Sequence, residues 1–222
     1  DIYCWNSLIF YKPPFSKSFV SMHQDQHYWG TKDKEDNVLT VQVAISNSNI
    51  KNGCLKILSK SHKSKFIHED YSNRDNMLAR GQTVFLKKNE KSRMKNMILS
   101  KGQCCIFHGN IVHGSMANNS NEPRFLFSIR YLTPDVKINK SLYYNDATLI
   151  AGIDKHKNFN EEKKIGEFDI IKLREDHRNI LLSQFKRYLT LKIKVKVIVN
   201  LAMFFLQNDY LRGFLYFLIK KT

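Results

Sequence analysis

A histidine and an aspartate stand two residues apart near the start of the chain, at His23 and Asp25, directly after an apolar segment. In an extended backbone these two side chains project to the same side, so both can reach one metal ion. A second histidine, His113, follows in the motif His-Gly-Ser. Two imidazoles and one carboxylate form the three-ligand face that holds Fe(II) in non-haem oxygenases. The pattern therefore indicates a metal site, with a surface turn for the first pair and a structural core histidine for His113 as the alternatives.

An arginine, Arg124, lies eleven residues after His113 within the apolar run 124–131. An unpaired guanidinium is costly among apolar side chains, so an inward-facing Arg124 predicts an anionic ligand. A guanidinium binds a carboxylate through two hydrogen bonds, which suits the distal carboxylate of a dicarboxylate cosubstrate. Arg130 lies six residues further on and faces the same side of the predicted strand. It either competes with Arg124 for this role or supports the site from behind.

The residues that must position these groups are predicted to form short strands. Apolar and β-branched runs recur between turns rich in Gly, Asn and Pro, without the spacing of alternating strands and helices. The run 38–45 is nearly continuous in apolar residues and predicts a strand buried on both faces. We expect a mainly β fold of the jelly-roll type. The predicted strands are 1–12, 15–22, 38–45, 54–58, 81–88, 94–99, 104–107 with a continuation through 108–115, and 124–131.

The end of the chain has a different pattern. Residues 170–191 carry apolar side chains at helical spacing, and residues 192–222 are apolar but interrupted by charged residues. A membrane-spanning helix needs about 20 largely uncharged residues, so no transmembrane segment is predicted. We expect a β domain over residues 1–165, which opens inside an apolar run and lacks an N-terminal part. Residues 166–222 are expected to form a helical segment packed on this domain, or a divergent tail.

Composition limits the class of protein. The 222 residues, of which 42% are hydrophobic, suffice for a globular core. The net charge of +16 suits an anionic partner, but the basic residues are spread along the chain, which does not favour nucleic acid. The four cysteines lack the Cys-X-X-Cys spacing of zinc and redox sites, and the adjacent Cys104 and Cys105 are expected to be buried free thiols. These features predict a cytoplasmic protein, and they assign no oligomeric state.

Several motifs taken together resemble the phytanoyl-CoA dioxygenase family of Fe(II)/2-oxoglutarate oxygenases. The resemblance covers residues 1–165. The matching stretches are Lys12-Pro13-Pro14, His23-Gln24-Asp25 with Tyr28-Trp29, Asn52-Gly53-Cys54-Leu55, Ser61-His62-Lys63, 76–82, Gly102-Gln103, His113-Gly114-Ser115 with Asn118 and Ser120, Arg124 with Ile129-Arg130-Tyr131, and 147–154.

The resemblance implies an enzyme with a double-stranded β-helix, the cupin-like jelly roll, and C-terminal helices. It implies Fe(II) bound by His23, Asp25 and His113, with 2-oxoglutarate as cosubstrate and O2 as oxidant, and no catalytic side chain beyond the metal ligands. It also implies a cosubstrate pocket. The residues assigned to this pocket are Arg124 at the distal carboxylate, Ser115 beside it, and Trp29, Lys12, Asn6 and Arg130 around them.

The implied reaction is hydroxylation of an unactivated C–H bond in a small-molecule substrate, free or linked to CoA or a carrier, with release of succinate and CO2. Halogenases of the same family carry Ala or Gly at the carboxylate position. That position is Asp25 here, which favours hydroxylation. The rival hypotheses are a basic binding protein without enzymatic activity, an oxygenase acting on nucleic acid, a halogenase-like relative and a metal-free relative of the same family. The intact His23, Asp25, His113 and Arg124 argue against the last of these. The sequence does not identify the substrate.

Overall fold

The computed structural model describes residues 1–78, 81–138 and 146–162, and Asp1–Lys163 forms one compact unit. The domain boundary predicted at residue 165 and the predicted C-terminal helices lie outside the described residues. Within the described part, no helix is long and apolar enough to cross a membrane.

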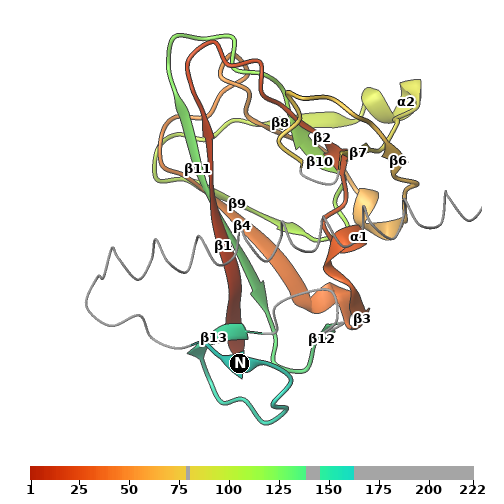
Figure 1. The fold of residues 1–222 in the computed structure, drawn as a ribbon, viewed down its shortest axis with the longest axis vertical. Helices are drawn as coiled ribbons and strands as arrows, with labels where there is room; N and C mark the ends of the chain where they lie inside the picture. Colours follow the sequence, from red (N-terminus) through yellow and green to blue (C-terminus); the bar gives the residue numbers. More distant parts are fainter. Residues whose placement is uncertain (79–80, 139–145, 163–222) are drawn as a thin grey trace, which may run out of the picture. The chain divides into compact units, whose positions relative to one another are not determined.

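Eight strands form the two antiparallel sheets of a jelly roll (Figure 1). The major sheet contains the order β1–β11–β4–β9, and the minor sheet has the order β2–β10–β5–β8. The chain passes from one sheet to the other at nearly every step, which is the connectivity of a double-stranded β-helix. The predicted mainly β, cupin-like fold is therefore confirmed. The eight strands are β1 (Ile2–Lys12), β2 (Val20–His23), β4 (Val38–Ala44), β5 (Leu55–Leu58), β8 (Met94–Met97), β9 (Cys104–His108), β10 (His113–Ser115) and β11 (Arg124–Leu132).

Shorter elements extend this framework. Strands β13 and β14 lengthen the major sheet beyond β1, while β3 pairs with β12 and β6 pairs with β7. The charged segment 31–37 contains a strand and a 3₁₀ turn, although its composition is typical of a loop. Only the end of the strand predicted over 15–22 forms, as β2. These elements are β3 (Thr31–Asp33), β6 (Glu69–Asp70), β7 (Gln82–Thr83), β12 (Lys137–Ile138), β13 (Asp146–Ala151), β14 (Asn160–Glu161), α1 (Gln26–Trp29), α2 (Lys88–Lys91), η1 (Glu35–Asn37) and η2 (Ser61–Lys63).

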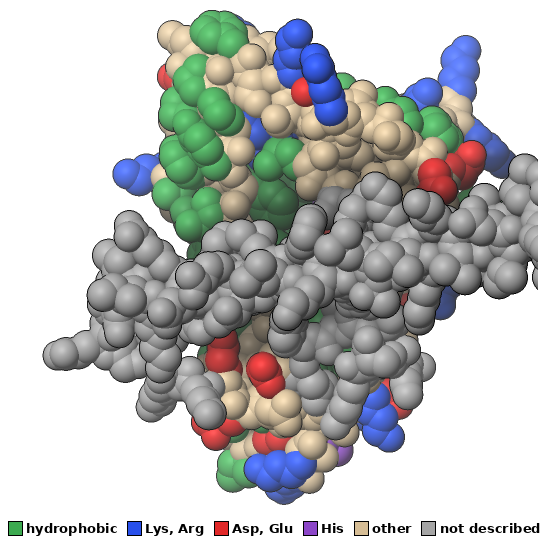
Figure 2. All heavy atoms as spheres, viewed as in Figure 1, with side chains coloured by type: hydrophobic (Ala, Val, Ile, Leu, Met, Phe, Trp, Pro, Cys, Tyr) green, Lys and Arg blue, Asp and Glu red, His purple; other side chains and the backbone are tan. Residues whose placement is uncertain are grey.

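Strand β4 alternates between a buried and a more exposed face, so the prediction of burial on both faces is wrong. Thr40 and Gln42 are buried, whereas Leu39, on the outward face of the strand, is 40% exposed. Side chains alternate in the same way along β9, where Cys105 is buried and Cys104 is exposed. The prediction that Cys104 is a buried thiol is therefore wrong. The outward face of this sheet also carries apolar residues, and Figure 2 shows such side chains gathered over β1 and β11. Composition alone therefore did not reveal which face of the strand points inward.

The hydrophobic core lies between the two sheets. Leu126 and Ala44 from the major sheet pack with Leu55 from the minor sheet in one buried cluster. Burying one such aliphatic side chain contributes about 1.5–3 kcal/mol, so this cluster holds the sheets together. Two polar side chains, Arg124 and Lys12, are as completely buried as these core residues. The core is thus apolar in its middle and cationic at one end.

A glycine controls the approach of two loops at this cationic end. Gly53 has a positive φ of +74°, and a Cβ atom placed there would lie 2.3 Å from the carbonyl oxygen of Met116. The Gly53 carbonyl also accepts a hydrogen bond from the Arg124 guanidinium. A side chain at this position therefore conflicts with both the backbone conformation and the neighbouring loop.

We predict that Gly53→Ala lowers the free energy of unfolding by about 3 kcal/mol, measured by urea denaturation, because strain and a backbone clash add together. The matched control is Gly102→Ala, where φ is +87° but nothing lies within 4 Å of the added Cβ. The control should lose only about 1 kcal/mol for the left-handed conformation. Equal losses in the two variants would contradict the close approach of the Met116 loop.

Candidate metal centre

The pairing of β2 with β10 brings two histidines together. His23 at the end of β2 lies directly opposite His113 at the start of β10. The strand ends at His23, and Asp25 follows at the N-cap of α1 rather than on the strand itself. All three side chains are buried, and one donor atom from each lies within 4.8 Å of the others. The structure thus brings together the three residues that the sequence singled out.

Backbone carbonyls orient both imidazoles. His23 Nδ1 lies 2.8 Å from the carbonyl oxygen of Ser21, and His113 Nδ1 lies 2.8 Å from that of Ile111. A proton on each Nδ1 satisfies these contacts and leaves the two Nε2 atoms as lone-pair donors. Burial and the neighbouring His23 lower the pKa of His113 to about 4, so this ring is neutral near pH 7. Neutral imidazole is the form that binds a metal ion.

Asp25 is held in its ionised form. Burial by itself would raise its pKa, but the Arg130 guanidinium and the two imidazoles outweigh this and lower the pKa below its ordinary value. Arg130 Nη2 lies 3.7 Å from Asp25 Oδ1, and Thr40 Oγ1 donates a hydrogen bond of 3.3 Å to Oδ2. The site therefore offers one ionised carboxylate and two imidazoles, of which that of His113 is neutral. This donor set can hold a divalent first-row transition metal.

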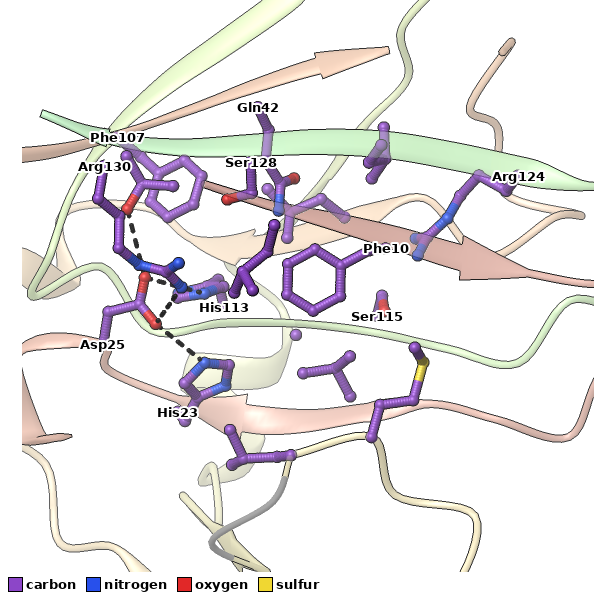
Figure 3. A pocket seen from close by; sticks show the side chains of 18 residues that line it. Phe10, His23, Asp25, Gln42, Phe107, His113, Ser115, Arg124, Ser128 and Arg130 are labelled. Atoms are coloured by element: carbon purple, nitrogen blue, oxygen red, sulfur yellow. Dashed lines mark hydrogen bonds and ion pairs between the residues drawn. The ribbon is translucent and has the colours of Figure 1, made fainter. Parts of the chain in front are cut away.

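A cavity of about 240 Å³ extends from this triad into the interior between the sheets. Figure 3 shows Arg124 at the opposite end from His23 and Asp25, with Phe10 between the two ends. The middle of the cavity is apolar, and Leu126 and Leu55 contribute to its walls. The space therefore suits an elongated ligand with polar ends.

The far end of the cavity carries positive charge. Arg124 donates a hydrogen bond to the Gly53 carbonyl, and its Nε has no partner. Lys12 Nζ donates to Ser115 Oγ at 2.8 Å. Burial and the neighbouring Arg124 lower the pKa of Lys12 to about 7, and burial lowers that of Arg124 to about 10. Within the described part of the chain no carboxylate pairs with either group, so this end is suited to an anion.

Of the six residues predicted for the cosubstrate pocket, Arg124, Ser115 and Arg130 line the cavity. The other three stand one layer behind it, against residues that do: Lys12 behind Ser115, and Asn6 and Trp29 behind Arg130.

The contacts of Arg130 lie at the triad end of the cavity. Its Nη1 donates to Asn6 Oδ1 at 2.9 Å, and its Cζ lies 5.5 Å from the centre of the Trp29 ring. Arg130 faces Asp25, so it does not compete with Arg124 for the far end of the cavity.

Sequence reasoning missed the support given by Gln24, which lies between the two predicted ligands. Its side chain is 2% exposed, does not line the cavity, and donates to the carbonyls of Ser64 and Asn110 while accepting from the Phe66 N–H. Thr40 was missed as well. The available signal was the pair of polar residues two positions apart in the strand 38–45, Thr40 and Gln42, because residues at alternate positions face the same side of a sheet.

A jelly roll with two histidines and one carboxylate on a cavity wall is the class of site found in non-haem iron oxygenases. The family model for phytanoyl-CoA dioxygenase matches residues 1–126. The chain belongs to the phytanoyl-CoA dioxygenase family, as the sequence motifs predicted.

Individual relatives agree with this assignment. The peroxisomal phytanoyl-CoA dioxygenase of Homo sapiens is 24% identical over 176 residues, which cover 77% of this chain and 52% of the human protein. The solved apo structure of the non-heme monooxygenase ThoJ has a TM-score of 0.66 and 25% identity, covering 86% of this chain and 69% of ThoJ. Its nickel complex gives a TM-score of 0.61 at 25% identity, over 83% and 65%. The chain thus spans about half the length of the human relative.

The lowered pKa of His113 predicts a pH dependence of stability in metal-free protein. The unfolded imidazole takes up a proton near pH 6.5, whereas the native one does so only near pH 4. The unfolded state therefore binds more protons in this window, and the free energy of unfolding should fall as the pH drops from about 6.5 to 4.

Urea denaturation of chelator-treated protein at several pH values measures this slope. His113→Gln should show a flatter slope, by up to one proton. His62→Gln, at an exposed position, serves as the control and should keep the original slope. An unchanged slope in His113→Gln would mean that the native imidazole titrates normally.

Proposed function

We propose that this protein is an Fe(II)- and 2-oxoglutarate-dependent dioxygenase that hydroxylates an unactivated C–H bond of a small-molecule substrate, releasing succinate and CO2. One observation carries the proposal. A triad of two imidazoles and an ionised carboxylate shares a single cavity with a buried cationic end that has no carboxylate partner among the described residues. The triad suits the metal ion, and the cationic end suits the distal carboxylate of the cosubstrate.

His23, Asp25 and His113 would hold the iron, which when bound supplies the activation of O2. The carbonyls of Ser21 and Ile111 keep both Nε2 atoms directed at the metal position. Arg130 keeps Asp25 ionised and ready to bind a cation. Because Asp25 supplies the carboxylate, the site lacks the vacancy that a halogenase uses for halide, which supports hydroxylation.

Arg124 would receive the distal carboxylate of 2-oxoglutarate, with Ser115 beside it and Lys12 behind. An anion at this end favours the ammonium form of Lys12, because opposite charges attract strongly in a buried site. Above pH 7, ligand binding should therefore be accompanied by proton uptake at Lys12 Nζ. The buried positive charge, unfavourable in the empty protein, is balanced when the ligand enters.

The substrate would approach along an apolar part of the cavity wall, which includes Val20, Met77 and Leu78. This wall favours a substrate with an apolar portion next to the reacting carbon, whether free or attached to CoA or a carrier.

The four cysteines are free, and on this basis we propose a cytoplasmic location.

The central experiment is anaerobic addition of Fe(II) and 2-oxoglutarate to the purified protein. We expect the visible charge-transfer band of a chelated 2-oxo acid, followed in air by succinate release. Asp25→Ala should lower succinate release at least 100-fold, because a metal ligand is lost. Asp70→Ala, an exposed residue on β6, is the control and should retain activity.

Full activity in Asp25→Ala would refute the assignment of the metal ligands. Failure of the unmodified protein to develop the band would refute the oxygenase proposal. Tight, strongly salt-dependent nucleic-acid binding without any need for iron would then support the basic binding protein instead.

The distal anchor makes a separate prediction about affinity. In Ni(II)-loaded protein, which binds ligands without turnover, Arg124→Met should weaken 2-oxoglutarate binding about 30-fold, since a charge-assisted hydrogen bond contributes about 2 kcal/mol. Binding of 2-oxopentanoate, which lacks the distal carboxylate, should not change. Calorimetry measures both constants, and the surface variant Arg93→Met serves as the control. Equal losses for the two ligands would place the distal carboxylate elsewhere.

A further inference from the structure

The cavity wall formed by the major sheet is arranged in rows. Neighbouring strands place Arg130 opposite Thr40, then Ser128 opposite Gln42, then Leu126 opposite Ala44. Residues two apart on a strand face the same side and lie about 6.7 Å from each other. Passing from the triad, the wall therefore presents a row that contacts Asp25, a polar row, and an apolar row.

The cationic end completes this series. Arg124 lies two residues before Leu126 in the sequence, on the same face of β11 and one step further from the triad. It lies opposite Lys12 on β1. The cavity wall along these strands thus presents, in order, the triad end, the polar pair Ser128 and Gln42, the apolar Leu126 and the cationic Arg124, with Lys12 behind it. This order is a chemical profile along the cavity, and a ligand must match it from end to end.

The polar pair has unsatisfied hydrogen-bonding groups. Gln42 is 6% exposed and Ser128 is 1% exposed, and both line the cavity. Gln42 Oε1 and Ser128 Oγ have no hydrogen-bond partner. A buried polar group left without a partner destabilises the folded protein, so its presence indicates a ligand that supplies the partner.

We propose that Gln42 and Ser128 bind the 2-oxo acid head of the cosubstrate, which is its C1 carboxylate and keto oxygen. This inference rests on the proposed function. 2-Oxoglutarate has oxygen atoms at its head, two methylene groups in the middle and a carboxylate at its far end. These parts correspond in order to the polar pair, to the apolar row with Leu126, and to Arg124. Figure 3 shows Gln42 and Ser128 on the wall between Arg130 and Arg124.

The donor chemistry of the two side chains agrees with this role. The Ser128 hydroxyl is free to donate its proton to a carboxylate or keto oxygen. The amide of Gln42 can rotate by half a turn without changing its shape, and this places its NH2 group where the unpartnered oxygen now stands. Two donors would then meet the head of the ligand beside the metal position. They would fix its orientation for chelation.

The pair could instead contact the substrate that is oxidised. Its position between the triad and Arg124 argues for the cosubstrate, because a dicarboxylate that spans these two ends must pass it. Each assignment has its own experimental outcome.

The test compares two ligands on Ni(II)-loaded protein by calorimetry: 2-oxoglutarate, and 2-oxopentanoate, which keeps the 2-oxo acid head and lacks the distal carboxylate. Ser128→Ala and Gln42→Leu should each weaken the binding of both ligands about tenfold, which is the effect of one lost hydrogen bond to a charged group. This differs from Arg124→Met, which should affect 2-oxoglutarate alone. Cys105→Ala is the matched control, since Cys105 pairs with Gln42 on β9 and does not line the cavity.

Thermal unfolding of the ligand-free protein gives a second readout. Ser128→Ala and Gln42→Leu remove buried polar atoms that have no partner, so neither should lower the melting temperature, whereas a structural role predicts a loss. Gln42→Glu keeps the size of the side chain and adds a negative charge. It should weaken both ligands more than Gln42→Leu, because it repels the C1 carboxylate.

Three results would overturn the inference: affinities equal to wild type in both Ser128→Ala and Gln42→Leu, a loss confined to 2-oxoglutarate, or a lowered melting temperature with unchanged affinity. A loss of substrate turnover at unchanged affinity for both 2-oxo acids would assign the pair to the oxidised substrate instead. Failure of the wild-type protein to bind either ligand would refute the proposed function itself, and is distinguished from the preceding results by needing no variant.

Discussion

The antiparallel pairing of β2 with β10 is the constraint on which the candidate site depends. Its register places His23 opposite His113, so two imidazoles separated by most of the β domain in sequence share one wall. The end of β2 then determines where Asp25 stands, because the chain turns into α1 at that point. A shift of one residue would direct one histidine to the other face of the sheet. The two histidines can therefore face each other only while β2 and β10 keep this register.

The balance of buried charge follows from that arrangement. Asp25 is compensated by Arg130, while Arg124 at the far end has no carboxylate partner among the described residues. Burying a guanidinium without compensation opposes folding, and a protein tolerates it where a ligand supplies the opposite charge. The same reasoning applies on a smaller scale to the neutral groups of Gln42 and Ser128. These buried groups without partners make the folded state less stable than it would be if each were paired.

Sequence reasoning succeeded where one residue type has a narrow chemical use. His23, Asp25, His113 and Arg124 were singled out because residue types suited to metal ions and carboxylates stood in or beside apolar strands, and the structure places all four around one cavity. It failed for the polar side chains of β4, because that strand carries apolar residues on its outward face as well. Periodicity then gave no direction, and Gln42 was overlooked. It also placed three residues, among them Lys12, in the cavity wall, although they stand one layer behind it.

The sequence by itself determined the type of fold and the donor set, since both depend on local pattern and on the identity of side chains. The tertiary structure decided what those residues face. Strand register set the order of rows along the cavity, from the triad through Ser128 and Leu126 to Arg124. It also decided which polar atoms remained without partners. These properties arise from contacts between strands far apart in the chain, so no local pattern contains them.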